Sequence, residues 1–200
     1  MARPYMNKIA RRKMLLETAA VIVDEYGWNT LSMISLAEHG KVSRQLVYQN
    51  FESVNDLTEQ TASYMFEELY TQTHEVLVNH TDDIVVAITK AQQILFSFSE
   101  GRVQALWALL SDNTSHNTPF SAVSRRYRKL ISDLYTPIIS RSMNLDAQHA
   151  GQVAWLLMMS FWGGQQLIHD NTISQARSLE LIQWYIERFV AGCKISNETS

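Results

Sequence analysis

Apolar side chains recur every three or four residues along nearly the whole chain, which is the spacing of one face of an α-helix. The first run predicts a helix over about residues 7–26, which Gly27 ends in a left-handed conformation. Because the 200 residues include only seven glycines and three prolines, few positions interrupt these runs. The pattern predicts an all-α fold of about nine helices. The inward-facing positions of the first helix are Ile9, Leu16, Ala19, Ala20 and Val23.

Residues 32–51 depart from this pattern, because they form two short amphipathic stretches separated by a turn. Gly40 permits the turn, Val42 fills its inner side, and the hydroxyl of Ser43 can cap the second stretch. Two short helices that share one core in this way form a helix-turn-helix. The positions that predict this core are Met33, Leu36 and Ala37 in the first stretch, and Leu46, Val47 and Phe51 in the second.

The outward face of the second stretch has the chemistry of a DNA major-groove reader. Arginine and glutamine side chains can each make paired hydrogen bonds to base edges, and tyrosine and serine hydroxyls reach phosphates. The basic residues near the chain start are either a solvated face or phosphate contacts, and Lys8 is the candidate we select. The predicted DNA-contacting residues are Lys8, Ser32, Ser43, Arg44, Gln45, Tyr48 and Gln49.

Roughly residues 9–60 resemble the N-terminal signature of TetR-type transcriptional regulators. In that family Tyr48 and Phe51 would belong to the Tyr-x-x-Phe motif that closes the recognition helix. The resemblance implies an N-terminal three-helix DNA-binding domain, a long fourth helix and a C-terminal helical domain for ligand binding and dimerisation. The matching positions are Leu15, Leu16, Ala19, Gly27, Leu36, Ala37, Val42, Ser43, Val47, Tyr48 and Phe51.

Two positions depart from the family signature. Lys41 stands at the position where the family usually has the turn glycine, and Gly40 comes one residue earlier. Either the turn is reshaped or Lys41 adopts a left-handed conformation. Val54 stands where a lysine usually contacts the DNA backbone, so one expected phosphate contact is missing. Neither change removes the helix-turn-helix pattern.

The rest of the chain predicts six longer or shorter helices and a domain boundary after residue 52. Ser53 and Asp56 form a variant capping box for a fourth helix, whose 25 or so residues would span about 37 Å. Asp82 and Asp83 cap the fifth helix, and Gly101 is expected to break the chain after it. Residues 1–52 are assigned to DNA binding and 53–200 to ligand binding and dimerisation. The predicted helices are 53–79, 82–100, 103–110, 119–143 with a kink at Pro137, 147–169 and 175–193.

Large aromatic and methionine side chains are abundant in the second predicted domain. They suit an apolar ligand pocket, although each one alone is as well explained by a hydrophobic core. An unidentified apolar or amphipathic small molecule is the effector that the resemblance implies. The predicted ligand-binding residues are Phe66, Phe96, Trp107, Leu110, Tyr127, Trp155, Met159, Trp162 and Gln166, with Gln104 and Asn113 as further polar candidates.

The last two predicted helices carry apolar stripes that need partners on more than one side. They can fill the core of one chain, or they can pair across a two-fold axis, as the family resemblance implies. A dimer would place two recognition helices on the two halves of a palindromic operator. Gly163 and Gly164 would permit close helix approach. The predicted dimer-interface residues are Leu157, Gly164, Ile182, Ile186 and Phe189.

Charge and composition limit the remaining function classes. The net charge of −3 divides into +3 for residues 1–51 and −6 for the rest, as expected when only the first part meets DNA. One cysteine, Cys193, and no visible targeting or membrane-spanning segment indicate a soluble cytoplasmic protein. No metal-ligand spacing, catalytic motif or phosphate-binding loop is present, so we expect no cofactor and no enzyme activity. The alternative is an all-helical binding protein or enzyme whose helix-turn-helix is only structural.

Overall fold

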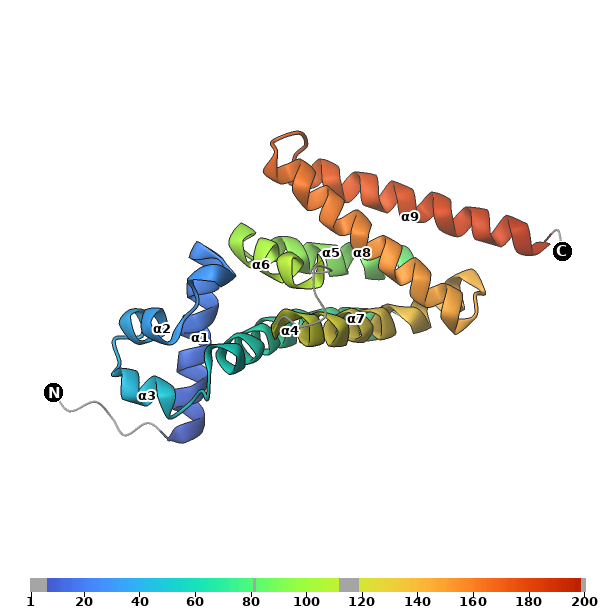
Figure 1. The fold of residues 1–200 in the computed structure, drawn as a ribbon. Helices are drawn as coiled ribbons and strands as arrows, with labels where there is room; N and C mark the ends of the chain where they lie inside the picture. The colour runs from blue at the N-terminus through green and yellow to red at the C-terminus, as the bar shows by residue number, and fades with distance from the viewer. Residues whose placement is uncertain (1–6, 81, 112–118, 199–200) are drawn as a thin grey trace. The chain divides into compact units, whose positions relative to one another are not determined.

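The computed structural model describes residues 7–80, 82–111 and 119–198, which are helical apart from short connections (Figure 1). Within these ranges no strand occurs, and the predicted all-α fold is confirmed. A short 3-10 helix covers Trp28–Thr30. The α-helices of the described residues are α1 (Lys8–Tyr26), α2 (Met33–His39), α3 (Arg44–Tyr48), α4 (Val54–Asn79), α5 (Ile84–Ser97), α6 (Glu100–Ser111), α7 (Pro119–Met143), α8 (Ala147–His169) and α9 (Gln175–Glu198).

The chain forms two compact units that do not follow the division at residue 52. Unit 1 consists of Met1–Glu68 and Phe98–Tyr127, and unit 2 of Leu69–Ser97 and Arg128–Ser200. Both α4 and α7 contribute residues to the two units. The boundary predicted after residue 52 divides the DNA-binding part from the ligand-binding part, and it was not drawn to divide the chain into packing units. It stays a prediction.

Unit 1 has a core in which α1 packs against α2 and α6, and α2 packs against α3. Most of the core residues expected from helical spacing are buried, including Ala19, Leu36 and Val47. Leu16 and Leu46 are only half-buried, and Ile9 is 81% exposed in the first turn of α1, so it does not reach this core. The buried hydrophobic residues of α1 to α3 and the adjoining loops are Leu15, Ala19, Ala20, Ile22, Val23, Leu31, Met33, Leu36, Ala37, Val47 and Phe51.

Local side-chain chemistry explains where several helices begin. Asn7 caps α1 by accepting the backbone N–H of Ala10 at 2.8 Å. Asp83 caps α5, where its Oδ1 accepts the N–H groups of Val85 and Val86. At α4, Ser53 accepts the N–H of Asp56 at 3.1 Å, as predicted. Asp56 returns a bond to the N–H of Glu52 rather than to that of Ser53, so the box is displaced by one residue.

Glycine and proline positions bring three refinements. Gly27 has the expected positive φ of 78°, but its ψ of 170° is extended rather than left-handed helical. Gly101 does not break the chain, because it lies in the first turn of α6, which begins at Glu100. Pro137 lies inside α7, which is a single helix from Pro119 to Met143.

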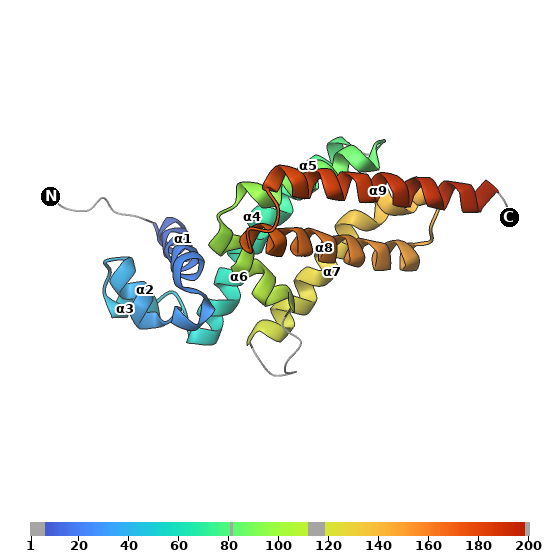
Figure 2. The same cartoon turned by 90° about the horizontal axis from the view of Figure 1, so that it is seen from above.

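Unit 2 is built largely from α5, α8 and α9, with both α5 and α8 packed against α9. Figure 2 shows α8 and α9 running side by side. Their shared interior contains Leu157, Phe161, Ile182 and Ile186, all buried within one chain. Among the described residues, no helix is long and apolar enough to cross a membrane.

Candidate nucleic-acid interface

The short helix α3 presents a polar face to solvent and a buried face to the core of unit 1. Val47 is fully buried, whereas Arg44, Gln45 and Tyr48 are all exposed, as is Gln49 at the C-cap. Ser43 accepts the N–H of Leu46 at 3.2 Å and so fixes the start of the helix. The structure therefore brings the predicted base-reading side chains together on one accessible surface.

The turn between α2 and α3 is made by Lys41 rather than by Gly40. Lys41 has a φ of 50°, in the left-handed region, whereas Gly40 has an ordinary helical φ of −72°. The left-handed alternative for Lys41 is thus the one the chain adopts, at a cost of about 1–2 kcal/mol relative to glycine. The N–H of Val42 closes the turn by donating to the carbonyl of Ala37 at 3.0 Å.

Lys8 and Ser32, two of the predicted phosphate contacts, differ in whether their polar groups already have hydrogen-bond partners. Lys8 is exposed in the first turn of α1, next to the capping Asn7. Ser32 caps α2 by accepting the N–H of Ser35 at 3.0 Å, and its hydroxyl donates to Ser35 Oγ at 3.0 Å. Because that hydroxyl proton is already used, Ser32 must rotate before it can donate to a phosphate.

Arg12 connects the end of α3 to its neighbours from inside unit 1. Its Nε donates to Gln60 Oε1 at 3.1 Å, and its Nη1 donates to the carbonyl of Asn50, two residues after α3 ends. The guanidinium also lies 5.2 Å from the ring centroid of Phe51. Sequence reasoning grouped Arg12 with the basic run, yet its spacing of three and seven residues from Leu15 and Ala19 already placed it on the inward face.

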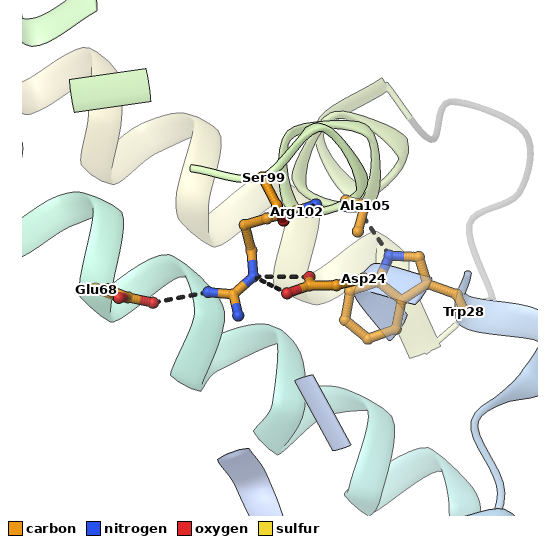
Figure 3. Close-up of polar contacts among 6 residues, drawn as sticks. All are labelled: Asp24, Trp28, Glu68, Ser99, Arg102 and Ala105. Carbon is orange, nitrogen blue, oxygen red and sulfur yellow. Dashed lines mark hydrogen bonds and ion pairs between the residues drawn. The ribbon is translucent and has the colours of Figure 1, made fainter. Parts of the chain in front are cut away.

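A second polar junction joins α1, α4 and α6 in unit 1 (Figure 3). Arg102 Nε donates to both carboxylate oxygens of Asp24, at 2.7 and 3.0 Å, and its Nη1 donates to Glu68 Oε2 at 2.7 Å. Trp28 Nε1 donates to the carbonyl of Ala105 at 2.9 Å. Burial lowers the pKa of Arg102, but the bonds and charges of Asp24 and Glu68 outweigh it and raise the pKa overall.

Gly101 explains how close α1 and α6 approach at this junction. A Cβ atom built on Gly101 would lie 1.9 Å from the backbone carbonyl oxygen of Asp24. No side chain fits in that space without separating the two helices. Sequence reasoning missed both Arg102 and this contact, because the partners lie 78 residues apart in the chain.

The residues predicted to bind a ligand are divided between the two units. In unit 1 the rings of Phe66 and Tyr127 stack at 4.2 Å, and the Tyr127 hydroxyl donates to the carbonyl of Ser63 at 3.4 Å. In unit 2 the guanidinium of Arg128 lies 5.5 Å from the ring of Trp155. Trp107 and Leu110 belong to unit 1, and Phe96, Trp155, Met159, Trp162 and Gln166 belong to unit 2. Asn113 lies outside the described residues, and the ligand site stays a prediction.

Most of the predicted dimer-interface residues are packed inside one chain. Leu157, Gly164, Ile182 and Ile186 are buried, and Phe189 is partly exposed. They therefore have little surface to offer a second copy. The outward faces of α8 and α9 instead carry a different set of exposed apolar side chains, which are Leu156, Leu167, Leu181, Trp184 and Tyr185.

No family model and no curated protein matches the sequence. Solved structures do match the fold. A TetR transcriptional regulator from Legionella pneumophila superposes with a TM-score of 0.72 at 17% identity, covering 94% of this chain and 99% of that one. A TetR-family transcriptional regulator from Streptomyces coelicolor gives 0.71 at 16% identity, covering 92% and 89%.

A transcriptional regulator from Rhodococcus sp. Rha1 gives a TM-score of 0.74 at 17% identity, covering 90% of this chain and 96% of that one. These likenesses extend through the C-terminal helices, where the sequence carries no common pattern. Together with the helix-turn-helix of α2 and α3, they show that this chain has the fold of the TetR-family transcriptional regulators.

Proposed function

We propose that this protein is a DNA-binding transcriptional regulator whose α3 reads base edges in the major groove. The observation that carries the proposal is the exposed set of Arg44, Gln45, Tyr48 and Gln49 on a helix whose other side is locked into the core. These side chains include no carboxylate, so nothing on this face repels phosphates. Lys8 and Ser43 are the proposed additional contacts to the DNA backbone.

The regulator acts as a homodimer in this proposal, joined through the exposed face of α8 and α9. Five large apolar side chains on these two adjacent helices are exposed to solvent in a single chain. Contact with a second copy would bury them. Gly163 supports this choice, because a Cβ built there meets nothing within 4 Å and leaves room for a partner helix. An isologous pair of this kind presents two recognition helices to a palindromic site.

A small apolar or amphipathic molecule is proposed to release the protein from its operator. Such a molecule must bind the DNA-free protein more tightly than the operator-bound protein. By linkage, the operator weakens binding of the molecule by the same factor by which the molecule weakens binding of the operator. Aromatic and methionine side chains of unit 2, such as Trp155 and Met159, supply adaptable apolar surface for it.

The test of DNA reading begins with sites that the purified protein selects from random duplexes. On a selected site, Arg44→Ala or Gln45→Ala is expected to cost about 1–3 kcal/mol and to relax the base preference. Tyr48→Phe removes one phosphate hydrogen bond, so it is expected to cost about 0.5–1.5 kcal/mol without changing the preference. Fluorescence anisotropy on selected and scrambled duplexes measures both effects.

Arg141→Ala is the matched control, because Arg141 is an exposed arginine in the last turn of α7, a helix that belongs neither to the proposed DNA-reading surface nor to the proposed dimer face. It should leave binding unchanged. Selection of no sequence by the wild-type protein, or equal losses for Arg44→Ala on selected and scrambled DNA, would contradict base reading by α3.

A further inference from the structure

The turn between α2 and α3 holds a lysine in a backbone conformation that lysine rarely adopts. Among the residues that the structure describes, three non-glycine residues have a positive φ, and they are Lys41, Asn144 and Asn171. Asparagine is several-fold enriched in this left-handed region, because its short polar side chain can hydrogen-bond locally. Lysine has no such compensation. Glycine would adopt the φ of 50° found at Lys41 without steric strain.

The neighbours of Lys41 in the turn face the core, whereas Lys41 itself is exposed. A Cβ built on Gly40 would lie 3.0 Å from the carbonyl oxygen of Leu36 and 3.9 Å from the Cδ2 methyl of Leu15 on α1. Position 40 therefore has little room for a side chain. Val42 lies on the same side, because its Cγ2 methyl is 3.6 Å from that Cβ position. The glycine of the turn is thus used for close packing, and the strained position carries a long charged side chain in solvent.

The hydrogen bonds that close the turn are made by backbone atoms. The N–H of Lys41 donates to the carbonyl of Glu38 at 3.2 Å, and the N–H of Val42 donates to the carbonyl of Ala37 at 3.0 Å. A glycine at position 41 would keep both bonds and relieve the strain. Strained backbone positions cluster at functional sites. The conformation of Lys41 therefore points to a role for its ammonium group outside the turn.

Lys41 lies beside the proposed base-reading side chains. Arg44 follows it by three residues, so the Cα atoms of the two are at most about 11 Å apart. The major groove of B-DNA is about 12 Å wide, and the sugar-phosphate strands border it. In a helix-turn-helix the first helix crosses the DNA backbone and the start of the second enters the groove. The turn that joins the two helices therefore passes close to phosphates at the edge of the groove.

The helix-turn-helix has few cations with which to bind those phosphates. Within residues 33–51 the lysine and arginine residues are Lys41 and Arg44, and the acidic residue is Glu38. Arg44 is the proposed reader of base edges. Lysine binds phosphate as a point charge on a flexible stem, which suits a contact at the edge of the groove.

We propose that Lys41 binds a phosphate of the DNA backbone at the edge of the major groove that α3 reads. This inference rests on the proposed DNA-binding function and adds a contact to that surface. A phosphate contact supplies affinity without base preference. The free protein carries the strain of the turn, and the gain in DNA affinity is what the lysine provides in return.

The experiment compares three substitutions at position 41 of the full-length protein, on duplexes that the wild type selects and on scrambled duplexes. Lys41→Gln removes the charge and keeps the strained backbone. Lys41→Gly removes both, and Lys41→Arg keeps both. Fluorescence anisotropy measures the dissociation constants over roughly 50–200 mM salt, and thermal unfolding measures the melting temperature of each variant.

Lys41→Gln and Lys41→Gly are expected to weaken binding about 10- to 100-fold at about 0.1 M salt, equally on selected and scrambled duplexes. The magnitude of the slope of log affinity against log salt should fall by about 0.9 per bound subunit, which is about 1.8 for a dimer. Lys41→Arg should bind within about twofold of the wild type. Lys41→Gly should also raise the melting temperature by up to about 4 °C, because it relieves the strain, so unfolding cannot explain its weaker DNA binding.

Lys90→Gln is the matched control. Lys90 is an exposed lysine on α5 in unit 2, so the substitution removes the same charge far along the chain from the helix-turn-helix. It should leave both the affinity and the salt slope unchanged.

Two results would overturn the phosphate contact. One is an unchanged salt slope for Lys41→Gln, which together with a lower melting temperature would identify Lys41 as a residue that only holds the turn. The other is a loss of affinity confined to the selected duplexes, which would mean that Lys41 reads bases. Both results leave the regulator proposal intact, because the wild type still selects a sequence. Failure of the wild type to bind any duplex would instead refute the DNA-binding function on which this inference rests.

Discussion

Arg12 is a basic residue near the proposed DNA surface whose charge is directed into the protein. Its guanidinium reaches Gln60, the carbonyl of Asn50 and the ring of Phe51. Gln60 in turn donates to Asp56 Oδ1 at 2.5 Å, which extends the connection along the first turns of α4. We therefore expect Arg12 to position the end of α3 rather than to contact phosphate.

Arg12→Gln tests this positioning role. We expect a loss of about 1–3 kcal/mol in unfolding free energy, since the Asn50 carbonyl and Gln60 lose a charged donor. Operator affinity should fall with it, while the slope of log affinity against log salt stays unchanged. Lys8→Gln is the comparison, because losing one phosphate contact from each of the two subunits reduces the magnitude of that slope by about 1.8, at about 0.9 per contact. A slope change of that size for Arg12→Gln would show that Arg12 contacts DNA after all.

At the scale of helices, the start of α6 depends on a contact that only glycine allows. Gly101→Ala would place a methyl group against the Asp24 carbonyl, 1.9 Å away in the present arrangement. Since backbone cannot rotate aside as a side chain can, we expect a loss of about 2–4 kcal/mol in unfolding free energy. Thermal and urea unfolding measure it.

Gly151→Ala on α8 is the matched control. Its new Cβ would meet only the hydroxyls of Ser132 and Thr136, at 3.3 and 3.7 Å, and both can adjust. Because alanine also favours the helix, this change is expected to be neutral or stabilising by up to about 1 kcal/mol. A Gly101→Ala protein as stable as Gly151→Ala would mean that α1 and α6 are separable at little cost.

The helices and their caps could be predicted because their causes lie within a few residues. Ser43 and Ser53 show this, since each cap bonds three residues ahead. The junction of Arg102 with Asp24 could not be predicted, because its residues meet only after distant helices pack. The burial of Gln92, which is 0% exposed on α5, was missed for the same reason, because a single glutamine in a helical run has no local signature. The outward position of α3 side chains was predictable from helical spacing, but their contacts with DNA remain predictions.

At the scale of the whole molecule, the burial of side chains within one chain determines which residues are available for contact with a second copy. The stripe chosen from the sequence contains Ile186, which is 0% exposed in a single chain. Helical spacing identifies an apolar stripe without telling whether it faces its own chain or another. On α9 the neighbouring positions Trp184 and Tyr185 are the exposed ones, so the proposed dimer face lies roughly on the opposite side of the helix from Ile186.

Trp184→Glu tests that face, because Trp184 is 57% exposed and a glutamate there is harmless in a monomer. In the proposed dimer the charge would be buried unpaired at a cost of several kcal/mol, so the dimer should dissociate at micromolar concentration. A single recognition helix loses the added affinity of a linked second one, and operator binding should fall by orders of magnitude. Val78→Glu, at a residue of 56% exposure on α4, is the matched control and should stay dimeric. Sedimentation that shows a dimer with full operator affinity for Trp184→Glu would place the subunit contact elsewhere on the surface.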